Sequence, residues 1–164
     1  MKTGNLSVTW LEASTTDDLE SSDRELTEEA IQASENAYAP YSKFCVGAAV
    51  RLDNGIILKG TNVENAAFPS GICAERSVVA CAVSNYPGHK IEAMAIAART
   101  SHGLTSEPVT PCGNCRQVIA EEEFRRSNNI RIILYGKERI LIFEKGNDLL
   151  PFQFDRNSLS SLLH

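Results

Sequence analysis

Two short cysteine segments carry the residues of this chain that are best suited to chemistry. Cys73 is followed two positions later by Glu75, and Cys112 and Cys115 form a Pro-Cys-x-x-Cys sequence. Three thiolates hold a zinc ion well and leave its fourth tetrahedral position open to water, which distinguishes a catalytic site from a closed structural one. We therefore predict a catalytic zinc site with Cys73, Cys112 and Cys115 as its protein ligands.

Each cysteine segment is expected to lie where a loop enters a helix. Cys112 and Cys115 stand at positions i and i+3, so one helical turn places both thiols on the same side. Pro111 suits such a start, because its missing N–H would have no partner there. The unpaired N–H groups and the positive end of the helix dipole stabilise thiolates. We expect two helix N-termini, one bearing Cys73 and one bearing the pair, to meet around the ion.

The carboxylate of Glu75 is the expected proton carrier. A glutamate in the first turn of a helix is commonly there because the helix dipole favours it. The position of Glu75, two residues from a metal ligand, favours general acid/base catalysis instead. In that role it takes a proton from zinc-bound water and passes it to the substrate.

Two arginines, Arg76 and Arg116, each follow a ligand segment directly. Three thiolates donate so much charge that they should weaken zinc as a Lewis acid. A hydrogen bond from an arginine to a ligand sulfur withdraws part of this charge. We predict that Arg76 or Arg116 makes such a bond.

Other uses of the cysteines are open at this point. A Cys-x-x-Cys pair also occurs in redox sites, but the redox motif follows an early strand of its fold, and here it lies in the last part of the chain. A closed structural zinc site could recruit Cys45, Cys81 or a histidine. Cys81 lies two helical turns beyond Cys73, about 12 Å away, too far to share an ion. We expect Cys45 and Cys81 to be packing residues.

The composition is that of an ordinary globular protein. The chain has 164 residues, of which 43% are hydrophobic and 23% charged, enough for one domain with a real core. Its net charge of −5 gives no electrostatic reason to bind nucleic acid. No apolar run approaches the roughly 18 residues that span a bilayer, so we expect no membrane partner.

The start of the chain lacks the features of an export signal. Residues 1–20 have neither a basic start nor an apolar run. The five cysteines are an odd number and do not form a closed disulfide set. We expect reduced thiols and a cytoplasmic location.

The order of local patterns predicts an α/β fold. Residues 1–22 are acidic and polar apart from Trp10-Leu11, and we expect a flexible extension there, followed by a single catalytic domain over 23–164. Ser22 to Glu25 has the form of a capping box, and Glu121–Glu123 are expected to face solvent. Asn54-Gly55 predicts a hairpin turn. Helices are expected over 23–38, 71–84, 113–124 and 158–163, and strands over 46–52, 56–62, 91–99, 131–135 and 140–143. This order predicts a three-layer α/β/α sandwich with a mixed, roughly five-stranded sheet.

Over most of its length the chain resembles a known family, the small zinc-dependent cytidine deaminases that form homotetramers. The resemblance runs from about Leu26 to Leu159 and rests on five linked motifs, at residues 41–49, 60–66, 72–76, 111–118 and 149–154. The sequence departs from the family at Cys45, where proline is common, at Phe68, where tyrosine is frequent, and at Ser77, a common threonine position. These departures affect the rim of the pocket and the subunit contacts more than the chemistry.

The resemblance implies a role for each matching position. Cys73, Cys112 and Cys115 would bind one zinc ion per subunit, and Glu75 would be the proton shuttle. The substrate-binding residues would be Phe44 against the pyrimidine, Asn62 and Glu64 on a ribose hydroxyl, the backbone at Ala74 on the base, and Phe154 in the pocket of a neighbouring subunit. An aromatic wall suits a neutral flat base, and a carboxylate with an amide suits a sugar hydroxyl.

The activity implied is hydrolytic deamination of cytidine and 2′-deoxycytidine to the uridine products, with release of ammonia, in pyrimidine salvage. The nearest alternative is deamination of an aminopyrimidine antibiotic such as blasticidin S, against which the ribose-type segment 62–65 argues. A polynucleotide-editing deaminase is disfavoured by the charge. A structural zinc module without turnover is the alternative from another class.

Overall fold

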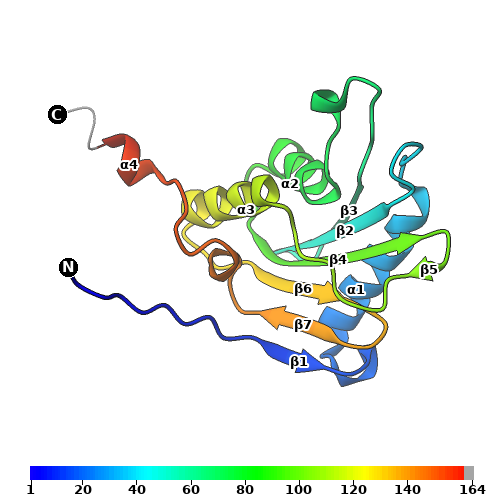
Figure 1. Cartoon of the computed structure of the whole chain (residues 1–164), viewed down its shortest axis with the longest axis horizontal. Coiled ribbons are helices and arrows are strands. Elements are labelled where there is room, and N and C mark those ends of the chain that lie inside the picture. The colour runs from blue at the N-terminus through cyan, green and yellow to red at the C-terminus, as the bar shows by residue number, and fades with distance from the viewer. Residues whose placement is uncertain (161–164) are drawn as a thin grey trace.

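A seven-stranded mixed sheet forms the centre of the molecule, and the computed structural model describes residues 1–160 of the chain (Figure 1). The strand order is β1-β7-β6-β4-β2-β3, and β5 pairs with β4 beside this path. The strands are β1 Leu11–Ala13, β2 Cys45–Leu52, β3 Ile57–Thr61, β4 Ile91–Thr100, β5 Gly103–Leu104, β6 Arg131–Tyr135 and β7 Ile140–Phe143. The helices are α1 Ser21–Ala33, α2 Ala74–Asn85, α3 Gly113–Arg126 and α4 Arg156–Ser160.

Helices cover both faces of the sheet, which confirms the predicted fold class. β4 and β6 are parallel, because the chain crosses over through α3 between them, and the other pairs are antiparallel. Alternate residues of β4 serve the two faces. Met94 and Ile96 pack in the cluster that includes α2 and α3 residues, and Ala93 and Ala95 pack in the cluster that includes α1 residues.

The two faces of the sheet differ in the size of the side chains that fill them. α1 lies so near β2 that a Cβ on Gly47 would come within 2.1 Å of the Ala30 carbonyl oxygen. The small side chains of β2 and β4 on that face therefore allow a tight helix-to-sheet contact, while larger aliphatic side chains fill the α2 and α3 face.

The start of α1 differs from the prediction. The expected capping box at Ser22 is wrong, since the helix begins at Ser21 and its N-cap, Glu20, makes no side-chain cap bond. A 3-10 turn, Thr16–Asp18, precedes this helix start. Its carbonyls at Thr16 and Asp17 accept hydrogen bonds from Arg24 at 3.0 and 2.9 Å, which ties the turn to the first turn of α1.

Two strands were not predicted, so the expected count of five is too low. β1 comes from the segment predicted as a flexible extension and pairs antiparallel with β7. The Trp10 ring lies 6.4 Å from that of Phe143, and Leu19 is only 7% exposed. Residues 11–19 are therefore held on the domain through β1 and Leu19. β1 was not predicted because three residues are too few to show the alternation of apolar and polar residues that indicates a strand. The boundary at residues 22 and 23 stays a prediction.

The prediction that Glu121–Glu123 all face solvent is wrong for two of the three glutamates. Glu121 is exposed as expected, but Glu122 and Glu123 are 5% and 3% exposed. The Glu123 carboxylate accepts hydrogen bonds from the backbone N–H groups of Ile130, Gly146 and Asn147, at 2.6, 2.7 and 2.9 Å. Glu122 is paired with the neighbouring Arg125 and Arg126. A glutamate triplet at a helix end is typical of a solvated face, and the distant backbone donors make the burial of Glu123 favourable.

The C-terminal segment leaves the body of the protein. α4 spans Arg156–Ser160 and stands away from the sheet in Figure 1. The predicted last helix over 158–163 therefore overlaps α4 only at its start, and residues 161–163 lie outside the described residues. Across residues 1–160, no helix has the length and apolar character that a membrane span needs.

Candidate metal centre

The three predicted ligand cysteines lie together. The Sγ atoms of Cys73, Cys112 and Cys115 are all within 4.8 Å of one another, with 3.9 Å from Cys73 to Cys112 and 3.4 Å from Cys112 to Cys115. Three sulfurs bound tetrahedrally to zinc at 2.3 Å would be about 3.8 Å apart. The cluster therefore fits one zinc ion. Within residues 1–160 no fourth cysteine, histidine or carboxylate joins this group, which argues against a closed four-ligand site.

Local helix geometry brings the thiols to this corner. Cys73 is the N-cap of α2 and Cys112 the N-cap of α3, both with extended backbones, at φ −78°, ψ 154° and φ −65°, ψ 165°. Cys115 lies in the first turn of α3 and is fully buried. The expected meeting of two helix N-termini is thus present.

The three thiols need a cation before all of them can be ionised. Burial raises the pKa of the Cys73 and Cys115 thiols, and the nearby Glu75 carboxylate raises them further. Burial acts on Cys112 too, but hydrogen bonds from the N–H groups and thiols around it lower its pKa. Three thiolates this close repel one another, and a divalent cation removes that repulsion by holding all three ionised. Three sulfur donors therefore suit a soft divalent cation such as zinc.

Glu75 lies on the first turn of α2 with only 5% of its surface exposed. Burial raises the pKa of its carboxyl above the ordinary value. A raised pKa brings a carboxyl nearer the range in which it can both accept and donate a proton at neutral pH. Its position and environment are those of a proton carrier beside the thiol corner.

A cavity of about 290 Å³ joins the predicted site residues. Phe44, Asn62, Glu64 and Ala74 line it, and so do Cys73, Glu75 and Cys112. The structure thus brings these sequence-predicted residues to one place. Ile96, Val109 and Thr110 also line the cavity and were not singled out from the sequence. Ile96 lies inside a continuous apolar strand, so no local signal marks it.

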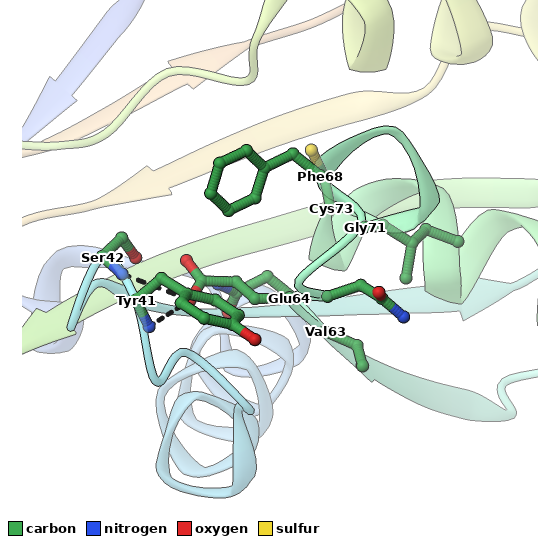
Figure 2. Close-up of a pocket in the computed structure, with 10 residues that line it drawn as sticks. Tyr41, Ser42, Val63, Glu64, Phe68, Gly71 and Cys73 are labelled. Atoms are coloured by element: carbon green, nitrogen blue, oxygen red, sulfur yellow. Dashed lines mark hydrogen bonds between the residues drawn. The ribbon is translucent and has the colours of Figure 1, made fainter.

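A wider hollow of about 570 Å³ adjoins this cavity (Figure 2). Cys73 is the one thiol of the three among its lining residues. Tyr41 and Phe68 face each other there edge to face, with ring centroids 5.8 Å apart. Asn62 and Glu64 line both spaces, so they mark the passage from the open hollow to the thiol corner.

Asn62 and Glu64 hold the loop that carries Phe44. Asn62 Oδ1 accepts from the Val46 N–H at 2.8 Å, and its Nδ2 donates to the Phe44 carbonyl at 2.9 Å. Glu64 Oε2 accepts from the N–H groups of Tyr41 and Ser42, at 2.8 and 3.2 Å, and Figure 2 shows these bonds. Hydrogen bonds from Ser42 and Tyr41 lower the pKa of the Glu64 carboxyl, which keeps it an acceptor.

The structure gives Arg116 oxygen partners in place of the ligand sulfur that was predicted for Arg76 or Arg116. Its guanidinium donates from Nε to the Pro111 carbonyl at 2.7 Å, from Nη1 to the Leu149 carbonyl at 2.9 Å and from Nη2 to Thr110 Oγ1 at 3.1 Å. These oxygens are stronger acceptors than a thiol, and they orient the guanidinium away from a bond to sulfur. Arg76 lines a hollow between α2 and α3, and its role stays a prediction.

The remaining predicted residues lie outside the thiol corner. Phe154 is 61% exposed, and its carbonyl accepts a hydrogen bond from Gln117 Nε2 at 2.7 Å. Its predicted contact with a neighbouring subunit stays a prediction. Cys45 and Cys81 are half-buried and stand apart from the metal group.

Comparison with known proteins gives consistent matches. The family model described as "Cytidine and deoxycytidylate deaminase zinc-binding region" matches residues 20–128. A cytidine deaminase of Halalkalibacterium halodurans is 46% identical over 97 residues, which cover 58% of this chain and 68% of that protein. A cytidine deaminase of Mycobacterium tuberculosis is 44% identical over 92 residues, 56% of this chain and 65% of that protein, just under two thirds.

A longer alignment and a solved structure extend the likeness. A probable cytidine deaminase of Dictyostelium discoideum is 33% identical over 141 residues, 83% of this chain and 88% of that protein. The crystal structure of a cytidine deaminase from Burkholderia pseudomallei aligns with a TM-score of 0.68 at 35% identity, covering 79% of this chain and 97% of the other. The family-model match over residues 20–128 includes both cysteine-bearing helices and all three thiols.

Proposed function

The chain belongs to the cytidine and deoxycytidylate deaminase zinc-binding family, and from this premise we propose that it deaminates cytidine and 2′-deoxycytidine hydrolytically. The products are uridine or 2′-deoxyuridine and ammonia, and the role is pyrimidine salvage. The observation that carries the proposal is the cluster of three thiols, two of which, Cys73 and Cys112, line one cavity together with the buried carboxyl of Glu75.

The protein residues divide the chemical work. Cys73, Cys112 and Cys115 would hold the zinc ion, which when bound would supply a water activated for attack on carbon 4 of the pyrimidine. Glu75 would accept one proton from the attacking water and deliver it to the ring nitrogen. It would then carry the second proton from the new hydroxyl on carbon 4 to the amino group, which leaves as ammonia while the carbonyl forms. Because Glu75 is nearly excluded from solvent, its proton is exchanged with the substrate rather than with bulk water.

The cavity walls suit a nucleoside. Phe44 provides a flat apolar surface for the base. Ala74 is the first residue of α2, so its N–H has no partner within the helix and can donate to the base carbonyl. Glu64 Oε1 remains for a ribose hydroxyl while Oε2 holds the Phe44 loop, and Asn62 stands beside it.

The assembly and the location are also part of this proposal. We infer a homotetramer in which Phe154 enters the cavity of a neighbouring subunit, in the cytoplasm, without a nucleic-acid partner. Two features support the assembly: Phe152 and Phe154 are 90% and 61% exposed, and an apolar hollow lies between α2 and α3. Light scattering that gives the mass of one subunit would refute it, and Phe154→Ala should raise KM more than it lowers kcat.

A direct assay separates the proposed function from its alternatives. Loss of ultraviolet absorbance is followed with cytidine, 2′-deoxycytidine, blasticidin S and a cytosine-containing single-stranded oligonucleotide, with zinc and after chelation. We expect turnover of both nucleosides, lost on chelation and restored by zinc. Turnover of the antibiotic or the oligonucleotide alone would identify another substrate class. No turnover of any substrate by zinc-loaded protein would leave a structural zinc module.

A further inference from the structure

Arg116 connects the loop that bears a predicted zinc ligand to the C-terminal part of the chain. We propose that Arg116 is a positioning residue, which fixes Cys112 in its ligand geometry by tying the Pro111 carbonyl and the Thr110 hydroxyl to Leu149. The inference rests on the proposed zinc site and concerns the residues that shape it. It replaces the electronic role predicted for this arginine from the sequence.

The first step is the contact with the loop itself. Arg116 Nε donates to the Pro111 carbonyl at 2.7 Å, and Nη2 donates to Thr110 Oγ1 at 3.1 Å. The Pro111 carbonyl belongs to the same planar peptide unit as the nitrogen of Cys112. Holding that oxygen therefore holds the plane from which the Cys112 side chain departs.

The loop needs such support because its own helix supplies little. Cys112 is the N-cap of α3 and is exposed, and its thiol can cap the first-turn N–H groups only as a weak acceptor. A helix start without a strong oxygen cap loses about 1 kcal/mol of local stability compared with one that has it. Arg116, one turn further along, donates back to the residue before the cap and so takes over part of this task.

The second step is the anchor on the other side. Arg116 Nη1 donates at 2.9 Å to the carbonyl of Leu149, which lies 33 residues away in the sequence and is 8% exposed. Leu149 ends the 3-10 turn Gly146–Leu149, and Glu123 holds the start of that turn through the N–H groups of Gly146 and Asn147. The carbonyl of Leu149 is thus a fixed point, packed in the core and braced from the end of α3.

The third step is that the contacts need a guanidinium. The three acceptors diverge, and Nε, Nη1 and Nη2 each reach a different one. A planar guanidinium offers five N–H donors in a rigid fork, whereas a lysine ammonium is a single point charge on a flexible stem. Arg116→Lys therefore keeps the positive charge near the thiols and removes the fork. This separates positioning from charge withdrawal.

Zinc release tests the positioning role without any substrate. The matched control is Arg126→Lys, at the other end of α3, where the arginine also donates to a backbone carbonyl, that of Pro87. We expect zinc transfer to a chromogenic chelator to be about tenfold to a hundredfold faster in Arg116→Lys, the usual effect of removing a group that orients a ligand. Arg126→Lys should release zinc at the rate of the unsubstituted protein.

Cobalt substitution gives a second readout, one that a general loss of stability would not move. Co²⁺ bound by three thiolates shows visible bands whose positions and intensities follow the coordination geometry. We expect altered bands in Arg116→Lys and unaltered bands in Arg126→Lys, at a temperature where circular dichroism shows both folded. Thr110→Val removes one of the three acceptors without touching the arginine, and it should release zinc about twofold to threefold faster.

The outcomes decide the proposal independently of the reaction. Unchanged zinc release and unchanged cobalt bands in Arg116→Lys would overturn it, and so would equal effects in Arg116→Lys and Arg126→Lys. If Arg116→Lys does not fold, unchanged zinc release by Thr110→Val overturns the proposal and faster release supports it. Neither measurement involves cytidine, so a failure of the proposed function would appear only in the substrate assay.

Discussion

The two helix starts that meet at the thiol corner are held by different forces. At the start of α2, Ala74 and Val78 are fully buried, and β3 lies so close that a Cβ on Gly60 would come within 2.7 Å of Val78 N and 2.8 Å of the Ala74 carbonyl oxygen. At the start of α3, Cys112 is exposed, and its loop is held by hydrogen bonds from Arg116.

This difference indicates that the two helix ends contribute to the site in different ways. Close packing tolerates almost no change of volume, so the α2 end is the rigid half and carries both Cys73 and Glu75. The α3 end carries two ligands on a polar scaffold that reaches into the C-terminal part of the chain. Substitutions at the α2 end should therefore act through chemistry and sterics, and those at the α3 end through the loss of single hydrogen bonds.

The largest effect is expected at the chemical group of the α2 end, in Glu75→Gln. The amide keeps the volume but cannot carry the proton, so kcat should fall by about 10²- to 10⁴-fold. Zinc content, measured by elemental analysis, should remain that of the unsubstituted protein. Glu28→Gln, an exposed glutamate of α1, is the control and should leave kcat unchanged. Near-normal turnover by Glu75→Gln would show that Glu75 is not the proton carrier.

A pair of glycine substitutions compares the two ends directly. The Cβ of Gly60→Ala would meet backbone atoms of α2, which cannot move aside without shifting the helix start. We expect a loss of about 1–3 kcal/mol in the free energy of unfolding, measured by urea denaturation. Gly113→Ala places a methyl group at the first residue of α3, where nothing lies within 4 Å.

The α3 partner of this pair should behave in the opposite way. Alanine suits a helix better than glycine, so Gly113→Ala is expected to leave stability unchanged or raise it by up to about 1 kcal/mol. Equal losses in Gly60→Ala and Gly113→Ala would remove the distinction between a packed and a hydrogen-bonded end.

The parts of the fold that the sequence predicted are those with local signals. β6 and β7 have the predicted bounds, because each is a short apolar run between polar residues. α2 and α3 begin next to their cysteines, since a loop-to-helix start is itself a local pattern. The hairpin at Asn54-Gly55 followed from turn chemistry, and Gly55 has the positive φ, 83°, that such a turn needs.

What the sequence did not predict depends on contacts between distant segments. β1 forms because β7 offers an unpaired edge, and three residues of the first segment fit it. Glu123 is buried because backbone N–H groups from two other segments converge on it. The predicted bond from Arg76 or Arg116 to a ligand sulfur rests on nearness in sequence, whereas the Leu149 carbonyl that Arg116 contacts is remote. Such acceptors have no signature in the local pattern.

The next prediction concerns the Glu123 carboxylate, near the C-terminal end of α3, which holds the Gly146–Leu149 turn. In Glu123→Gln the side chain keeps its size, but its amide NH₂ replaces one acceptor and faces a backbone N–H. The buried donor left without a partner should cost about 1–2 kcal/mol in the free energy of unfolding. Urea denaturation measures this, and Glu28→Gln is again the control. A cost near zero would show that the Gly146–Leu149 turn does not need the carboxylate, and would weaken its role as a fixed point for Arg116.

The smallest effect is expected where the α3 scaffold meets the solvent-exposed tail, in Gln117→Ala. Gln117 Nε2 donates one hydrogen bond to the Phe154 carbonyl, at 2.7 Å between exposed groups, so its loss should change global stability by less than about 1 kcal/mol. The Arg156 guanidinium still lies 4.8 Å from the centre of the Phe124 ring and keeps part of the tail in place.

Limited trypsin digestion detects this local loosening, because cleavage after Arg156 follows the population of the open tail. We expect cleavage about twofold to fivefold faster in Gln117→Ala, as a hydrogen bond worth about 0.5–1 kcal/mol implies. Gln32→Ala, on α1 and far from the tail in the sequence, should be cut at the original rate. An unchanged rate in Gln117→Ala would mean that the tail is held by Arg156 and Phe124 rather than by the helix turn next to the metal ligands. The hydrogen bonds that connect the start of α3 to the C-terminal part of the chain would then extend to Leu149 and not to the tail.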